Sequence, residues 1–302
     1  MALISIDGLK LSVEGRVIRQ GEIHDEYWLD RKSIGNPEQV IDYIKESGIP
    51  IDIFNFSQKV PDTDPQYNFY FEWDNVAALR IKSFDHWWTN QVNDKTRNMV
   101  RKSQKKGIEV KVMRFEEDLI KGITEIYNET PVRQGRPFWH YGKDVNTVRN
   151  ENSSYLERSD FLVAYCQNEV VGFIKLVYVD EVAGMMQILS KVKDRDKAPN
   201  NALVSKAVEV CAEKNLNFLT YSKFTYGKKG IDPVARFKQH NGFEQIDIPR
   251  YFVPLNWKGQ LCLKTGLHKE MSEIVPEWFS SSLRKVRANW YKRKNLPPIL
   301  GE

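Results

Sequence analysis

Three side chains are the candidates for catalysis: Lys238, His140 and Tyr221. A lysine ammonium can stabilise the negative charge that develops on a carbonyl oxygen under attack. A tyrosine hydroxyl can donate a proton, and an imidazole, with a reference pKa near ~6.5, can accept one from an amine. Together these residue types favour transfer of an acyl group to an amine. The alternative for each is ordinary packing or solvation.

A charged, proline-containing break at residues 193–201 precedes an amphipathic helix pattern over Ala202–Lys214. A helix N-terminus presents unbonded N–H groups and a partial positive charge, so it suits a phosphate. An arginine can add a bidentate contact, whereas asparagine here could simply be the N-cap. A strand pattern over Phe218–Phe224 follows, and Lys223 within it and Tyr226 just after it are further candidates for binding the donor. The predicted donor-binding residues are Arg195, Lys197, Asn200, Asn201, Lys223 and Tyr226.

A dense loop at residues 130–142 crowds arginines and aromatic residues between two predicted helices. Aromatic rings stack on sugar faces, and arginine forks bind carboxylates or phosphates. The loop therefore suits a sugar or an anionic acceptor, although its aromatic residues could equally serve only to hold the loop in place. The predicted acceptor-binding residues are Arg133, Gln134, Arg136, Trp139 and Tyr141.

The composition limits the class of protein. With 302 residues, 41% of them apolar and 28% charged, the chain can form a sizeable core and is not broadly disordered. No apolar run approaches the ~18 residues that span a bilayer, and the N-terminus does not read as a secretory signal. The cysteines and histidines are scattered, so we expect buried thiols and no metal site. No P-loop, hydrolase elbow or dinucleotide glycine motif is present.

Hydrophobic periodicity indicates which elements position these residues. In the first third it predicts a strand pair around a turn at Asp74-Asn75, and then one long helix over His86–Lys106 that Asp85 caps. A second region repeats a strand-helix alternation up to residue 256. Its predicted order is a strand at 108–115, a helix at 116–128, the loop, a helix from Val145, strands at 161–166, 170–179 and 185–192, the helix after the break, a strand, a short helix at 232–241 and a last strand at 252–255.

Basic residues are concentrated in two places, and the net charge is +5. One is the run at residues 97–106. The other is a tail helix over 276–294, where aromatic and basic residues alternate. Such runs are usually solvated faces, but they also suit an anionic partner such as tRNA or an acidic membrane surface.

The element order over 108–256 resembles the GNAT superfamily of acyltransferases, and Phe237-Lys-Gln-His-Asn-Gly-Phe243 is similar to its closing motif. The segment at 96–110 resembles the helix-to-strand segment of FemAB-like transferases, which carry two GNAT-type modules, and Phe237-Lys238 resembles their Phe-Lys signature. The resemblance implies a mixed α/β fold with a largely antiparallel sheet. It also implies a degenerate module at 1–107, a module with the active site at 108–256, and a basic helical tail at 257–302.

The activity that the resemblance implies is N-acyl transfer by direct attack of an amine, without a metal. The donor is acyl-CoA or aminoacyl-tRNA, and the acceptor is a precursor of cell-envelope peptidoglycan or polysaccharide, or an amino sugar. This implies a cytoplasmic protein, with peripheral membrane contact through 276–294 as an option. The alternatives are a FemAB-like peptidyltransferase that uses aminoacyl-tRNA and a non-catalytic binding protein with a GNAT fold.

Two departures from the GNAT pattern affect the expected donor. The usual pyrophosphate loop has spaced glycines, whereas residues 195–201 contain none, and Pro199 removes one N–H donor. Many GNAT enzymes also place a tyrosine acid where this chain has Phe237. These departures weaken the expectation of acyl-CoA and favour the donor of the FemAB-like branch.

Overall fold

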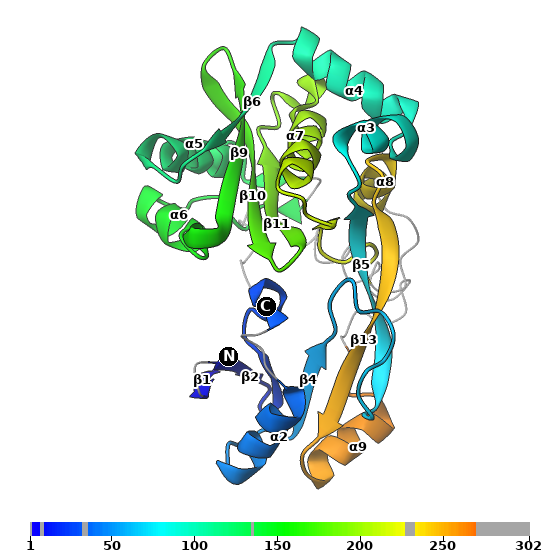
Figure 1. Ribbon diagram of the computed structural model, residues 1–302. Coiled ribbons are helices and arrows are strands. Elements are labelled where there is room, and N and C mark those ends of the chain that lie inside the picture. Colours follow the sequence, from blue (N-terminus) through cyan, green and yellow to red (C-terminus); the bar gives the residue numbers. More distant parts are fainter. Residues whose placement is uncertain (1, 7–8, 32–35, 134–135, 227–232, 270–302) are drawn as a thin grey trace. The chain divides into compact units, whose positions relative to one another are not determined.

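The computed structural model describes residues 2–6, 9–31, 36–133, 136–226 and 233–269 (Figure 1). The chain divides into two compact units. Unit 1 comprises Met1–Ala78, Lys223–Gly230 and Gln245–Pro276, and unit 2 comprises Leu79–Ser222, Ile231–Glu244 and Glu277–Glu302. The expected mixed α/β class with mostly antiparallel strands is confirmed. The module boundaries at 107 and 256 stay a prediction, and the basic tail at 276–294 lies outside the described residues.

In the sheet of unit 1, the pairs β1–β2, β2–β3 and β4–β13 are antiparallel, and β3 and β4 pair in parallel. A hydrophobic core lies between one face of this sheet and helix α2. Ile53 and Phe252 on the other face pack with Cys262 of helix α9. The strand order is β1 (Ala2–Ile6), β2 (Leu9–Glu14), β3 (Gln20–Ile23), β4 (Ile53–Ser57), β13 (Glu244–Pro254) and β5 (Phe71–Arg80).

The helices of unit 1 follow local rules. In α2 (Pro37–Glu46) the Asn36 side chain accepts from the N–H of Glu38, and proline occupies the first helical position. Val40, Ile41 and Ile44 then form a buried stripe. The short 3-10 turn η1 (Glu26–Trp28) lies between β3 and α2, and α9 (Trp257–Thr265) follows β13. Local capping and periodicity therefore account for these elements.

Unit 2 has a sheet covered on both faces. Phe173 packs with the cluster of α5 (Glu117–Asn128), whereas its neighbour Gly172 lies against Leu203 of α7 (Pro199–Glu213), so these helices cover opposite faces. The strand order is β12 (Phe218–Thr220), β11 (Val182–Ser190), β10 (Glu169–Val179), β9 (Ser159–Cys166) and β6 (Ile108–Met113). Helix α6 (Val145–Asn152), the turn η3 (Leu156–Arg158) and helix α8 (Pro233–His240) complete this part.

The prediction of one helix over His86–Lys106 was wrong. The segment contains α3 (Phe84–His86), a π-helical turn η2 (Trp87–Gln91) and α4 (Asp94–Lys105). Val92 is extended, and the Asn93 side chain accepts from the N–H of Thr96, so a second helix starts there. The predicted cap was also wrong, because Ser83 caps the first helix instead of Asp85.

Two predicted strand boundaries were wrong as well. Asp74-Asn75 is no turn but lies within the continuous strand β5. The strand predicted over 218–224 is only the three residues of β12, and Ser222 adopts a left-handed conformation with φ of 50°. Tyr221 therefore follows the strand.

Trp87 anchors α8 to the turn η2. Its indole is fully buried, and Nε1 donates to the carbonyl oxygen of Asn241 over 2.9 Å. The hydroxyl of Thr96 donates to the carbonyl of His240 over 2.8 Å. These contacts fix the C-terminal end of α8.

We expect Trp87→Phe to lower the free energy of unfolding by about 2 kcal/mol, since it leaves the Asn241 carbonyl without its donor and shrinks a buried ring. Trp88→Phe, at the half-buried neighbouring position, should cost less than about 1 kcal/mol. Urea unfolding of both variants measures the difference. Equal losses would contradict the anchoring role of Trp87.

Candidate functional site

Two predicted catalytic residues lie together in unit 2. Lys238 on α8 is completely buried, and its Nζ lies 4.5 Å from the centroid of the Tyr221 ring. This ring also packs edge-on against Phe243, with a centroid separation of 6.3 Å. The structure therefore places an ammonium group beside a tyrosine ring immediately after β12.

The strands β11 and β12 separate at this point. Their parallel ladder joins Val182–Gly184 to Phe218–Thr220 and ends there. β11 continues to Ser190 and stays paired with β10 along its other edge. The backbone of β11 beyond Gly184 consequently runs on past the end of β12, with Tyr221 next in the chain after that end.

The loop between α5 and α6 is fastened to the end of β11. The guanidinium of Arg133 donates to the carbonyl oxygens of Ser190 (2.9 Å) and Ile126 (2.6 Å) and forms an ion pair with Glu129 at 3.5 Å. The Glu129 carboxylate accepts from the N–H of Lys193 over 2.9 Å. Burial lowers the pKa of Arg133, against the opposing effect of Glu129. In this structure Arg133 braces the loop that was predicted to bind the acceptor.

The other predicted acceptor residues differ in exposure. Trp139 is 62% exposed and Tyr141 43% exposed, and the Lys143 ammonium lies 3.6 Å from the centroid of the Trp139 ring. Arg136 is exposed on β8 (Arg136–Pro137), opposite Arg133 of β7 (Val132–Arg133). Gln134 lies outside the described residues. The loop thus presents aromatic surface to solvent while its base is fixed.

His140 is buried in a polar network. The amide nitrogen of Gln187 donates to its Nε2 (3.1 Å), and the Tyr127 hydroxyl donates to the Gln187 oxygen (2.9 Å). Its Nδ1 lies 3.4 Å from the Lys143 ammonium. Burial, and then the positive charges of Lys143 and Arg133, lowers the pKa of His140 to about 4. The imidazole is therefore neutral at pH 7 and joins the loop to β11.

The loop before α7 differs from the prediction. The helix starts at Pro199, before the predicted Ala202, and its N-cap is Ala198 in a left-handed conformation (φ 56°), with no side-chain cap. The expectation that an asparagine caps this helix was therefore wrong. Asn200 and Asn201 lie in the first turn, and the buried Asn200 Oδ1 has no hydrogen-bond partner among the described residues.

The two basic residues of this loop have different surroundings. They lie in the short turn η4 (Arg195–Lys197), where Arg195 is exposed. Lys197 Nζ lies 2.7 Å from the Asp194 carboxylate and 3.3 Å from the Cys166 sulfur, and these hydrogen bonds raise its pKa. Both cations, and the start of α7, are available to a phosphate at this edge of unit 2.

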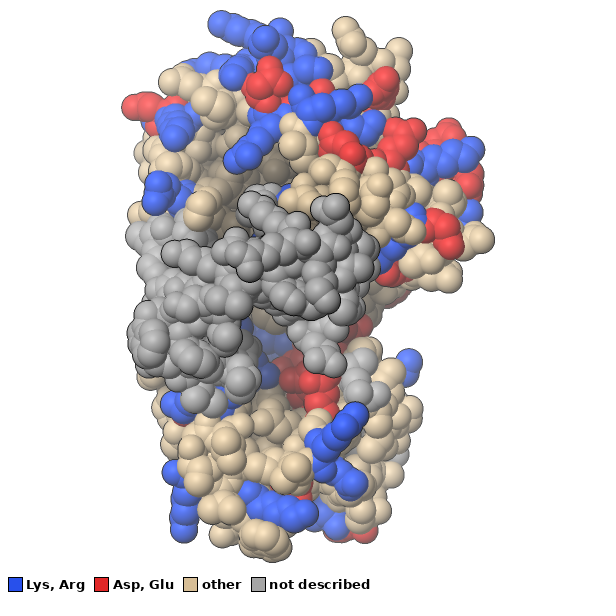
Figure 2. All heavy atoms as spheres, turned by 180° about the vertical axis from the view of Figure 1, so that it is seen from behind, with Lys and Arg blue, Asp and Glu red and all other residues tan. Residues whose placement is uncertain are grey.

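The basic helix α4 packs against α7 and η4. Figure 2 shows Lys and Arg side chains gathered at the end of unit 2 where Figure 1 places α4, with acidic side chains among them. The exposed or partly exposed basic residues of this segment are Lys95, Arg97, Arg101, Lys102, Lys105 and Lys106. A basic surface therefore adjoins the loop that was predicted to bind donor phosphates.

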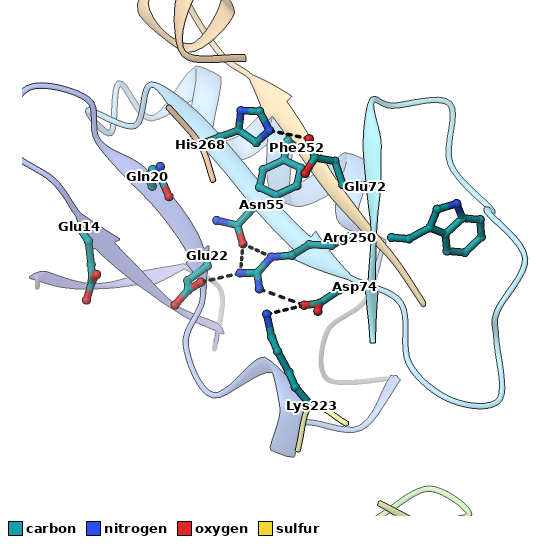
Figure 3. Close-up of a pocket in the computed structure, with 11 residues that line it drawn as sticks. Glu14, Gln20, Glu22, Asn55, Glu72, Asp74, Lys223, Arg250, Phe252 and His268 are labelled. Atoms are coloured by element: carbon teal, nitrogen blue, oxygen red, sulfur yellow. Dashed lines mark hydrogen bonds and ion pairs between the residues drawn. The ribbon is translucent and has the colours of Figure 1, made fainter. Parts of the chain in front are cut away.

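Lys223 and Tyr226 belong to unit 1, whereas the other predicted donor-binding residues belong to unit 2. Lys223 forms an ion pair with Asp74 at 3.1 Å, and both line a recess of about 240 Å³ (Figure 3). Tyr226 is 45% exposed. The recess is formed within unit 1 by polar side chains, including Glu22, Glu72 and Arg250.

The sequence reasoning missed this recess and the His140 network. Gln187 interrupts an apolar strand pattern, and this could have marked it as a half-buried polar residue with hydrogen-bond partners. Glu72 and Asp74 alternate along β5, but reading Asp74-Asn75 as a turn concealed that pattern. Arg250 and Asn55 are distant in sequence, so no local sequence pattern indicates that they form a hydrogen bond.

Two further findings concern the described residues alone. They contain no group of three or more His, Cys, Asp or Glu side chains placed to hold a metal ion. Among these same residues, no helix has the length and apolar character needed to cross a bilayer.

Neither a protein-family model nor a curated protein matches this chain. Solved structures do. The crystal structure of FemX has 11% identity and a TM-score of 0.57, covering 82% of this chain and 86% of that one. The structure of L-PGS from Bacillus licheniformis has 12% identity and a TM-score of 0.56, covering 86% and 85%.

A third similar structure is the C-terminal domain of a protein assigned as a lysylphosphatidylglycerol synthetase from Agrobacterium fabrum. Its identity is 13% and its TM-score 0.54, covering 85% of this chain and 83% of that one. At these identities the likeness shows the fold alone. The predicted FemAB-like, GNAT-type fold is confirmed.

The pKa of His140 predicts how stability depends on pH. Because the folded-state pKa (about 4) is below the ordinary value, the unfolded chain binds a proton between ~6.5 and 4 and the folded protein does not. The contribution of His140 to the free energy of unfolding is thus fully present above about pH 6.5. It falls with decreasing pH, by about 2 kcal/mol from pH 7 to pH 5.

We expect His140→Gln to remove this pH dependence, measured by urea unfolding at both pH values. The control is His86→Gln, since His86 is a half-buried histidine that is hydrogen-bonded to Asn90. This variant should keep the wild-type dependence of unfolding free energy on pH. A wild-type slope in His140→Gln would show that the buried imidazole does not cause the effect.

Proposed function

We propose that this chain transfers an acyl or aminoacyl group from an activated donor to an amine. The observation that carries the proposal is the separation of β11 and β12 with Tyr221 and Lys238 at that point, in a FemAB-like, GNAT-type fold. The similar L-PGS and lysylphosphatidylglycerol synthetase structures support it, because the latter name describes attachment of a lysyl group to a lipid.

The proposed reaction is a direct displacement. The amine nitrogen attacks the donor carbonyl beside the exposed edge of β11, and a C–N bond forms as the C–S or C–O bond to the leaving group breaks. The amine gives up one proton to solvent or to a base, and the leaving group takes one up. No covalent intermediate on the protein is required.

Tyr221 and Lys238 are assigned complementary roles in this reaction. The Tyr221 hydroxyl protonates the leaving group, a function that Phe237 cannot perform. Lys238, with its ammonium 4.5 Å from the Tyr221 ring, stabilises the negative charge that develops on the tyrosine oxygen and at the carbonyl. Because Lys238 is completely buried, it acts mainly through Tyr221 as a positioning residue.

His140 is the base that the sequence predicts, but its surroundings favour another role. A base with a pKa near 4 holds a proton only weakly at pH 7, and its Nε2 already accepts from Gln187. We therefore assign His140 to fixing the acceptor loop. The exposed rings of Trp139 and Tyr141 on that loop suit an amino sugar or another envelope precursor as acceptor.

Of the two donors, the loop before α7 favours aminoacyl-tRNA over acyl-CoA. It has no glycine through which backbone N–H groups could approach a pyrophosphate closely. The basic helix α4 packs beside it, and such a surface suits a long polyanion. A cytoplasmic location follows from this donor, with peripheral membrane contact if the acceptor is lipid-linked.

We expect Tyr221→Phe to lower kcat for transfer by about 10²-fold or more, with donor affinity unchanged, because only proton transfer is lost. Lys238→Met should lower kcat similarly. The assay follows a radiolabelled acyl group from acetyl-CoA or charged tRNA into an envelope-precursor extract. Tyr43→Phe on α2 is the control and should be fully active. Wild-type rates in folded Tyr221→Phe and Lys238→Met would favour a non-catalytic binding protein.

The donor is tested by thermal shift, because a ligand that binds only the native state raises the melting temperature. We expect a shift with aminoacyl-tRNA and none with CoA or acetyl-CoA. Affinity for tRNA should fall steeply with salt, and a charge reversal at Lys102 and Lys105 should weaken it. A shift with acetyl-CoA alone, or salt-independent tRNA binding, would reject the tRNA donor.

A further inference from the structure

The recess in unit 1 lies on one face of its sheet. Asn55 points into it, whereas Phe54 and Phe56 on either side belong to the core of the opposite face. Asn55 is paired in register with Glu22 on β3 and with Phe252 on β13, which also line the recess. One face of these strands therefore forms the polar floor of the recess, and the opposite face packs in the hydrophobic core.

Arg250 lies at the centre of this floor (Figure 3). Its guanidinium donates to Asn55 Oδ1 from Nη2 (2.6 Å) and from Nε (3.2 Å), and Asn55 is only 4% exposed. Nη2 also lies 3.2 Å from Glu22, and Nη1 lies 3.7 Å from Asp74. A buried amide and two carboxylates thus hold the arginine in a defined orientation.

A second set of contacts fixes the far wall. His268 is buried, and its Nε2 lies 3.0 Å from Glu72, which Lys269 also approaches at 3.0 Å. Burial raises the pKa of Glu72, but hydrogen bonds from His268, Tyr70 and Lys269 outweigh this and lower it. The walls are consequently preorganised without a ligand.

Apart from the exposed Glu14, the charged residues that line the recess are already paired. Arg250 faces Glu22 and Asp74, Lys223 faces Asp74, and Glu72 faces His268. An ionic ligand would have to compete with these pairs. Hydroxyl groups would not, because carboxylates keep further lone pairs and a guanidinium has five N–H donors. The lining therefore suits a neutral ligand with many hydrogen-bonding groups.

Size and shape narrow the class of ligand. A volume of about 240 Å³ is below the usual range of about 300–1,000 Å³ for pockets that hold drug-sized molecules. Phe252 also lines the recess but is only 8% exposed, so the polar groups make most of the contact surface, and the small volume limits the ligand to about one ring. We infer that this recess binds a single sugar ring.

The test is calorimetric titration of the full chain with D-glucose and N-acetyl-D-glucosamine. Cyclohexanol and D-glucuronate are the comparison ligands. We expect at least one of the sugars to bind, and cyclohexanol, which has one hydroxyl, to bind about tenfold more weakly or not at all. Glucuronate should also bind more weakly than glucose, because its charge competes with the ion pairs.

Two variants locate the binding. Asp74→Asn and Glu22→Gln keep side-chain shape, and each should weaken sugar binding about tenfold. Glu22 is half exposed, so its variant is expected to fold even if Asp74→Asn is destabilised. Asp42→Asn, an exposed carboxylate on α2 in the same unit, should bind as the wild type does.

The inference is overturned if no sugar binds, if cyclohexanol or glucuronate binds as well as the sugars do, or if the folded Glu22→Gln variant keeps wild-type affinity. It does not rest on the proposed transfer reaction. The titrations contain no donor, so a negative result leaves that reaction standing, and loss of transfer in Tyr221→Phe leaves the sugar site standing.

Discussion

The short parallel ladder between β11 and β12 is the constraint on which the geometry of unit 2 depends. Parallel strands need a crossover, and here α7 supplies it, so β11 and β12 run in the same direction. The loop that follows β11 leads into the N-terminus of α7, and the residue that follows β12 is Tyr221. Had β12 continued for four more residues, Tyr221 would be a ladder residue and the edge of β11 would be covered.

Several polar side chains of unit 2 that have little exposure connect one element to another. Lys175 is nearly inaccessible, and its ammonium donates to the carbonyl oxygens of Asn152 and Ser154 after α6, while burial lowers its pKa to about 8. His140 joins the loop to Gln187, and Arg133 joins it to the end of β11. An unpaired buried polar group is costly, so each of these contacts limits where the loop can lie. The accessible surface of the loop then includes Arg136, Trp139 and Tyr141.

Periodicity predicted most elements because the core-facing residues of α2, α5 and the strands repeat at the spacing of their own backbone. It failed where tertiary contacts override local preference. Asp74-Asn75 has turn residues, yet strand pairing keeps β5 extended. Lys238 and Tyr221 were predicted from the sequence, and they lie close together in the structure. This prediction was possible because a resemblance in element order carries information about long-range contacts. Pairings such as Arg250 with Asn55 have no counterpart in local sequence, so the recess could not be predicted.

The two ligand-facing surfaces proposed here use charge in opposite ways. Around α4 and η4, basic side chains outnumber their acidic neighbours, so an anion gains Coulomb energy that salt screens. In the recess of unit 1 the charged lining residues, apart from the exposed Glu14, are paired at short range, and a neutral ligand gains only directed hydrogen bonds. Added salt should therefore weaken binding at the first surface and leave the second almost unchanged, since closely paired and partly buried charges are screened far less. The surface around α4 would thus recognise a donor by its net charge, whereas the recess would recognise a ligand by the positions of its hydrogen-bonding groups.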